Sequence, residues 1–212
     1  METTLKTTDY TTLASQSSIN KAIGALKIRG VEATVVENRA EALSVIKQII
    51  PTGASVMNGS SRTLEEIGFV DYLKSNEHQW NNLHKAILEE DDKEKRGQLR
   101  KQSVLSDYYL GSVHAAAETG QFVIASNSGS QLPHIVYTSP NLIFVVGAQK
   151  ITPNLDAAIT RVREYVLPLE DKRMKEAGAP GSAISKLLIF EKEPKFLGRK
   201  VFVIFVNEKL GF

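Results

Sequence analysis

Cysteine is absent from this sequence of 212 residues. Its absence excludes disulfides, thiolate metal sites, cysteine nucleophiles and cysteine-ligated iron–sulfur clusters. Histidine is scarce, with four residues, and no pair has the H-E-x-x-H spacing that places two imidazoles on one helix face. We therefore expect no metal site and no directly bound cofactor, so that a redox role would need the redox centre of a partner protein.

The sequence also lacks long apolar runs and a dominant charge. Its 26 basic and 24 acidic residues leave a net charge of +2, which is too small for a surface that holds a nucleic-acid backbone. No segment approaches the ~20 apolar residues of a membrane span, and the first ten residues lack the apolar core of a signal peptide. These absences predict a cytoplasmic protein that binds neither nucleic acid nor membrane.

What is present indicates a globular protein. A hydrophobic share of 42% and a charged share of 24% are close to the averages of folded domains. The length allows one large domain or two small ones. We expect a flexible tail over residues 1–13 and a single domain over residues 14–212.

Helical and strand-like patterns alternate along the chain. Apolar residues at helical spacing predict helices that begin near Ser18 and near Ala42, and Gly30 and Pro51 are expected to end them. Four short apolar or β-branched runs predict strands, and residues 71–109 favour helices with one solvated bend. These strands cover residues 33–37, 54–57, 112–117 and 121–126.

The second half continues the alternation. The run 142–146 is typical of a strand buried on both faces, and a helix through Val166 is expected to follow it, with Thr152 as cap and Pro153 in its first turn. Residues 170–185 are polar and glycine-rich and are predicted to form a loop, and residues 187–190 and 201–206 are predicted strands. Serial strand–helix units predict a Rossmann-like α/β fold, with a mainly parallel sheet, helices on both faces and ligands at the carboxyl ends of the strands.

A first candidate site lies between a predicted strand and a predicted helix. Small hydroxyls, free backbone amides and a guanidinium could converge there on a phosphate or carboxylate. The alternative is an ordinary helix cap and tight turn, with Thr63 and Glu66 as a capping box. The residues are Asn58, Gly59, Ser60, Ser61, Arg62 and Thr63.

A second candidate is Glu118, a solitary acid placed to act as a general base or nucleophile, or else a solvated turn carboxylate. Thr119 and Gly120 follow it, and one predicted strand later comes a loop that contains Ser126, Asn127, Gly129, Ser130 and Gln131. Because one hairpin joins the two loops, we expect them to face the same cleft. Lys150 is a further candidate contact for an anion, although a lysine near a helix start is usually only solvated.

Taken together, several sequence blocks resemble the lactate-utilisation (LUD) domain family. They are Met57-Asn58-Gly59-Ser60-Ser61-x-Thr63-Leu64-x-Glu66-Ile67-Gly68, Ala117-Glu118-Thr119-Gly120, Ser126-Asn127-x-Gly129-Ser130, Val145-Val146-Gly147-x-x-Lys150-Ile151-x-Pro153 and Val206-Asn207-Glu208-Lys209-Leu210-Gly211-Phe212. The resemblance covers nearly the whole chain from about Ala14. This sequence departs from the family pattern in one block, because residues Ala179–Ser185 lack an acid that the pattern contains.

The resemblance implies a fold of the superfamily that contains ribose-5-phosphate isomerase, glucosamine-6-phosphate deaminase and the CoA transferases. In those relatives an acid at the position that Glu118 matches transfers protons or attacks an acyl group. The loop 58–63 would correspond to their anion-binding loop, and the loop 126–131 to their second glycine-rich loop. Family members are associated with lactate oxidation beside a cysteine-rich iron–sulfur subunit.

Three hypotheses follow. The first is a non-redox accessory subunit for the oxidation of lactate to pyruvate, which binds a small anionic metabolite and has an iron–sulfur partner subunit. The second is a small isomerase or acyl/CoA transferase that uses Glu118. The third is a structural or regulatory domain without catalysis, and a homo-oligomer is compatible with all three.

Overall fold

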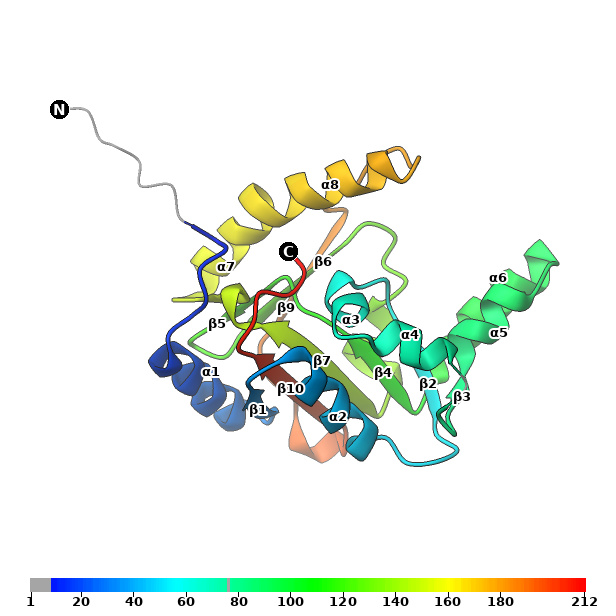
Figure 1. The fold of residues 1–212 in the computed structure, drawn as a ribbon, viewed down its shortest axis with the longest axis horizontal. Coiled ribbons are helices and arrows are strands. Elements are labelled where there is room, and N and C mark those ends of the chain that lie inside the picture. Colours follow the sequence, from blue (N-terminus) through cyan, green and yellow to red (C-terminus); the bar gives the residue numbers. More distant parts are fainter. Residues whose placement is uncertain (1–8, 76) are drawn as a thin grey trace.

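The computed structural model describes residues 9–75 and 77–212, and its centre is a parallel sheet of six strands (Figure 1). All neighbouring pairs in this sheet are parallel. In spatial order the strands are β1 (Glu32–Val36), β10 (Lys200–Val206), β7 (Asn141–Gly147), β4 (Tyr108–Gly111), β2 (Ser55–Asn58) and β3 (Asn81–Asn82). The predicted α/β class with a mainly parallel sheet is confirmed.

The central strands of this sheet are apolar on both sides, because each face is covered. Along β7 and β10, alternate residues join two different clusters of buried side chains. On one face Phe144 packs in a cluster with Leu26 of α1 (Gln16–Ile28), and on the other Val145 packs in a cluster with Ile46 of α2 (Arg39–Ile49). Burial on both faces explains the continuous apolar run 142–146.

A second, smaller sheet packs on the same face as α1. Its order is β8 (Ile151–Thr152), β5 (Ala115–Ala117), β6 (Phe122–Ser126) and β9 (Lys186–Phe190). β6 is antiparallel to both β5 and β9, so the predicted hairpin is present. Phe122 and Ile124 of β6 share a buried cluster with Phe144 of β7, which fixes this sheet against the large one.

Short helices complete the layers. On the α2 side lie α3 (Arg62–Glu66) and α4 (Phe69–Lys74), and α5 (Leu83–Glu89) and α6 (Lys93–Gln102) form the predicted helices of the charged region, followed by the 3-10 turn η1 (Ser103–Leu105). Figure 1 shows α6 extending from the β2–β3 edge of the sheet, away from α1. The predicted capping box of α3 is wrong: the cap is Ser61, whose hydroxyl accepts from the amide of Leu64 at 3.3 Å.

Two further expectations about helices are wrong. Asn154, not Thr152, caps α7 (Leu155–Arg161), so Pro153 precedes the helix. The helix also does not end before Pro168: it continues through the π-helical turn η4 (Val162–Val166) into α8 (Leu167–Glu176). Pro168 is the second residue of α8 and lies directly after the π-helical turn, where the helical hydrogen-bond pattern changes. The predicted loop therefore shrinks to residues 177–185.

The strand β4 was not predicted, because its four residues follow a charged helical region and give only a short apolar pattern. The predicted tail lies largely outside the described residues, and within its described part the ring of Tyr10 packs against Tyr165 with centroids 5.3 Å apart. In the part of the chain that the structure describes, no helix is both long and apolar enough to cross a bilayer.

Candidate functional site

The carboxyl ends of four adjacent parallel strands open into one cavity of about 620 Å³. Asn58 ends β2, Ser112 follows β4, Lys150 follows β7, and Gly211 lies beyond β10. This is the edge at which ligands bind in open α/β sheets. The volume is in the range of metabolite sites.

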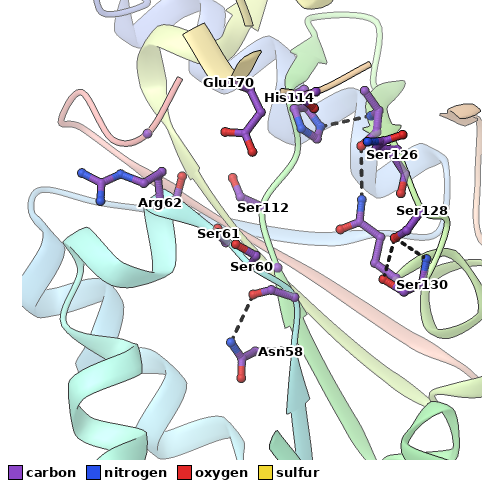
Figure 2. A pocket seen from close by; sticks show the side chains of 18 of the residues that line it. Asn58, Ser60, Ser61, Arg62, Ser112, His114, Ser126, Ser128, Ser130 and Glu170 are labelled. Atoms are coloured by element: carbon purple, nitrogen blue, oxygen red, sulfur yellow. Dashed lines mark hydrogen bonds between the residues drawn. The ribbon is translucent and has the colours of Figure 1, made fainter. Parts of the chain in front are cut away.

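The loop between β2 and α3 lies in this cavity, as predicted, with all six of its residues in the lining: Asn58, Gly59, Ser60, Ser61, Arg62 and Thr63. Oδ1 of Asn58 lies 3.0 Å from Nδ1 of His84, which fixes the end of the strand. Nδ2 of Asn58 donates to the carbonyl of Gly59 at 3.1 Å (Figure 2). A side chain at position 59 would overlap the buried hydroxyl of Tyr109, so the close approach of these two segments requires glycine.

The loop after β6 forms another wall. Ser126, Asn127, Ser130 and Gln131 line the cavity, together with Ser128, which the sequence reasoning passed over, whereas Gly129 does not. The Ser126 hydroxyl accepts from the amide of Gly129 at 2.9 Å, and Nε2 of Gln131 donates to the carbonyl of Ala125 at 3.2 Å. The loop thus presents hydroxyls and amides to the cavity without a charge.

Glu118 is not part of this cavity, and neither are Thr119 and Gly120. The expectation that the two loops of the hairpin share one cleft is wrong, because β6 itself separates them. Five residue steps along a strand span roughly 17 Å, so the turn 118–120 and the loop 126–131 lie at opposite ends of the same strand.

The turn at Glu118 instead packs against α1. Nε of Arg29 donates to the carbonyl of Thr119 at 2.8 Å, and the carboxylate of Glu118 forms an ion pair with Lys21 at 3.1 Å. A hydrogen bond from the Ser18 hydroxyl, and then Lys21, lower the pKa of Glu118. The carboxylate is held ionised on the α1 side of the molecule, so its residue contributes nothing to the cavity.

Lys150 is the central ionisable group of the site. Only 3% of the residue is exposed, and its Nζ donates to Oγ1 of Thr63 at 3.0 Å and to Oγ of Ser112 at 3.1 Å. Among the described residues no carboxylate lies within 4 Å of this nitrogen. Burial, and next the charge of Arg161, lower the pKa of Lys150 to about 7. The alternative of an ordinary solvated lysine does not apply to this buried residue.

A second buried cation lies close to the residues that line the cavity. Arg161 of α7 is fully buried, and its Nη1 donates to the carbonyl of His114, while its Nε and Nη2 find no partner among the described residues. Its guanidinium carbon lies 5.1 Å from the ring centre of Tyr165. No carboxylate of the described residues forms an ion pair with either Arg161 or Lys150.

His114 lines the cavity as a neutral imidazole. The amide of Ala125 donates to its Nδ1 at 3.1 Å, so the ring proton is on Nε2. Burial, followed by the charges of Lys150 and Arg161, lowers the pKa of His114 to about 3. His114 therefore offers one N–H donor and no positive charge. His114 was not among the candidate site residues from the sequence.

α8 and the C-terminal residues form a further part of the cavity wall. Glu170 carries the one side-chain carboxylate that the described residues contribute to the lining, and both of its oxygens accept from Arg173, at 2.7 and 2.6 Å. Figure 2 shows its side chain pointing toward Ser112. The side-chain Nε2 of Gln149 donates to the carbonyl of Leu210 at 2.8 Å. This hydrogen bond places Gly211 beside Lys150. Sequence reasoning missed this wall because it interpreted residues 170–176 as a loop.

The remaining histidine of the cavity lining, His134, also packs in the core. His134 is buried, its Nδ1 lies 3.0 Å from the Ser139 hydroxyl, and its ring stacks on Tyr109 at 4.5 Å. Burial lowers the pKa of His134 to about 4. Within the described residues, no cluster of histidine, aspartate and glutamate side chains has the arrangement that could hold a metal ion.

Comparisons with known proteins place the chain in context. A family model described as the LUD domain matches residues 19–184. The crystal structure of a DUF162 family protein from Deinococcus radiodurans is similar with a TM-score of 0.56 and 12% sequence identity, over 92% of this chain and 99% of that chain. At that identity the likeness supports the fold alone. A comparison with curated protein sequences gave no match.

Proposed function

We propose, from the premise that this chain belongs to the LUD domain family, that it binds a small anionic metabolite as a non-redox accessory subunit of lactate utilisation. The family-model match confirms the predicted resemblance to LUD domains. The family connects the chain in general terms with lactate utilisation. The ligand, its cavity and the role as a subunit are the proposal.

One observation carries the proposal: the buried amine of Lys150 has hydroxyl groups, and no carboxylate, as its partners. A buried ammonium is costly unless a negative charge compensates it. The described residues that line the cavity contribute four basic side chains, Arg62, Arg100, Lys150 and Arg173, and one acidic side chain, that of Glu170. An anionic ligand would supply the missing charge.

The surroundings of Lys150 fit a carboxylate with a neighbouring oxygen. Hydroxyls of Thr63 and Ser112 and the Nε2–H of His114 can donate or accept hydrogen bonds beside a charged group. Apolar side chains, among them Leu88 and Met174, also line the cavity. The full volume exceeds what one small acid fills, so the proposed binding position is the part beside Lys150.

The link to lactate oxidation rests on the family and on the absence of cysteine. A chain without thiolates cannot ligate an iron–sulfur cluster through cysteine, so electrons would pass through a partner subunit. The cytoplasmic location and the relation to the superfamily of ribose-5-phosphate isomerase and the CoA transferases, both predicted from the sequence, belong to this proposal.

The test is a thermal-shift screen with L-lactate, D-lactate, pyruvate, ribose 5-phosphate and acetyl-CoA. A ligand that binds only the native state must raise the melting temperature. We expect a rise with at least one small anion in the wild type and no rise in Lys150→Met. Lys172→Met is the matched control, because Lys172 is largely exposed on α8 and its ion pair with Glu176 is a surface one.

Two outcomes would contradict the proposal. One is that no anion of the panel stabilises the wild type. The other is that Lys150→Met responds to the anions as strongly as Lys172→Met does. The cellular role is tested separately: growth on lactate should be lost on deletion of the gene and restored by the wild type, and unchanged growth would refute the role.

A further inference from the structure

The two hydroxyl groups beside Lys150 donate their own protons to backbone carbonyls. Oγ1 of Thr63 donates to the carbonyl of Leu210 at 3.4 Å, and Oγ of Ser112 donates to the carbonyl of Val113 at 3.3 Å. A hydroxyl carries one proton and two lone pairs. Each oxygen therefore faces Nζ with a lone pair, and each accepts one N–H from it.

These contacts match a neutral amine. A neutral amine has two N–H groups and one lone pair, and the hydroxyls of Thr63 and Ser112 accept both N–H groups. An ammonium would have a third N–H, for which the described residues offer no acceptor within hydrogen-bond distance. Burial lowers the pKa of Lys150 to about 7, which agrees with this hydrogen-bond pattern. A neutral, buried amine with a free lone pair is a nucleophile for carbonyl groups.

We propose that Lys150 captures a small anionic aldehyde or ketone, of which a 2-oxo acid is the simplest kind, as an imine on its Nζ. The inference rests on the proposed function, because the same cavity must admit the ligand. It goes further by assigning covalent chemistry to the lysine. The reacting end of the ligand must be small, because a side-chain atom at Gly211 would already lie 3.2 Å from Nζ.

The step balances without a cofactor. The lone pair of Nζ forms a bond to the carbonyl carbon as the carbonyl π bond breaks. The two amine protons leave with the former carbonyl oxygen as one water molecule, and a C=N double bond remains. The hydroxyls of Thr63 and Ser112, released from the amine protons, can accept hydrogen bonds from the departing water.

The positive charges of nearby arginines indicate that the ligand carries an anionic group beside its carbonyl. Imine formation removes the hydrogen-bond donors of Lys150, but two positive charges remain. Arg161, which lies outside the lining, is fully buried with two unpartnered nitrogens and donates to the carbonyl of His114, and Arg62 lines the cavity. No described carboxylate pairs with Arg161. A ligand that combines a carbonyl with a carboxylate is therefore favoured over a neutral ketone such as acetone.

The experiment is reductive trapping on the full chain. The wild type is incubated at pH 7 with pyruvate, glyoxylate or acetone and sodium cyanoborohydride, and the adducts are mapped by peptide mass spectrometry. At this pH an ordinary lysine has roughly a thousandfold less neutral amine than one with a pKa near 7. We expect modification of Lys150 by pyruvate or glyoxylate to be at least about tenfold faster than that of exposed Lys172, and faster than modification by acetone.

Thr63→Val with Ser112→Ala provides a second variant that keeps the lysine and removes its hydroxyl partners, and we expect slower trapping at Lys150. Labelling of Lys150 no faster than of Lys172 overturns the inference. If L-lactate, which has no carbonyl carbon open to attack, stabilises the protein and pyruvate leaves no adduct at Lys150, the imine is refuted and the anion site stands. If no anion stabilises the protein and no adduct forms at Lys150, both the anion site and the imine are refuted. The comparison of labelling at Lys150 and Lys172 is made in the wild type, so it does not depend on the folding of a variant.

Discussion

Nζ of Lys150 lies 3.0 Å from Oγ1 of Thr63, which is 87 residues earlier in the chain. The contact joins the end of β7 to the first turn of α3, so that two parallel-strand ends share one polar position inside the cavity. The Ser112 hydroxyl after β4 is the other acceptor. The amine is therefore positioned by three separate segments of the fold, and its surroundings contain hydroxyls where a structural lysine would have a carboxylate.

The buried amine should make the free energy of unfolding depend on pH. The pKa of Lys150 is about 7 in the folded protein and an ordinary 10.5 when the chain is unfolded, so between these values the unfolded chain binds more protons. The destabilisation is fully present below pH 7 and is relieved as the pH rises toward 10.5. The groups that act on this pKa through their charge are Arg161, which lowers it, and Glu66, which raises it.

We expect the wild type to gain stability relative to Lys150→Met as the pH rises from 7 to 10, by on the order of a few kcal/mol. Urea unfolding at a series of pH values measures the difference. Lys172→Met, which changes an exposed lysine, should follow the wild type at every pH. A difference between wild type and Lys150→Met that stays constant over this range would refute the lowered pKa.

Anion binding should take up protons. A bound carboxylate favours the ammonium form of Lys150 and so raises its pKa. At pH 8, where most of the free protein has a neutral amine, binding of a panel anion such as L-lactate should take up close to one proton, and at pH 5.5 almost none. Calorimetric titrations in buffers of different ionisation enthalpy measure this number. Equal heats in all buffers at pH 8 would contradict it.

Glu118→Gln should leave ligand binding intact. The carboxylate lies on the α1 side of the molecule and is absent from the cavity lining, and its partner is the exposed Lys21. Loss of an exposed ion pair costs about 0.2–1 kcal/mol, so we expect a small drop in melting temperature and an unchanged ligand response. A lost ligand response in this variant would restore Glu118 as a site residue.

Gly59→Ala should destabilise the fold through Tyr109. The added methyl group would overlap the tyrosine hydroxyl, which is buried beneath the loop. Overpacking of this kind costs about 1–3 kcal/mol. Tyr109→Phe removes the oxygen, so the double variant should recover much of the loss in chemical denaturation. If the two effects simply add, the contact between these residues does not explain the glycine.

Much of the fold could be predicted because local patterns and burial agree. The run 142–146 is apolar at every position because β7 has covered faces on both sides, and the segment 58–63 was identified as a site because glycine and hydroxyls follow a strand. The end of β4 was missed, and with it Ser112, because four residues after a charged region give little periodicity.

The composition of the site was less predictable, because it depends on which end of a strand a residue occupies. Glu118 and Ser126 are close in sequence, but β6 runs between them and carries them to opposite ends. Lys150 was a candidate anion contact from the sequence, but its burial could not be predicted, because it depends on Thr63, Ser112 and the C-terminal residues, which are distant in the sequence. Only the assembled fold brings these residues together.

An NMR titration of Lys150 tests the central claim, an anion site built on this amine, most directly. With ¹³C-labelled lysine and Lys150→Met to assign the signal, the Cε shift is followed against pH in the free protein and with saturating L-lactate or another anion of the panel. The account predicts a pKa of about 7 in the free protein and a clear rise with the anion. An ordinary lysine pKa that no anion moves would contradict it.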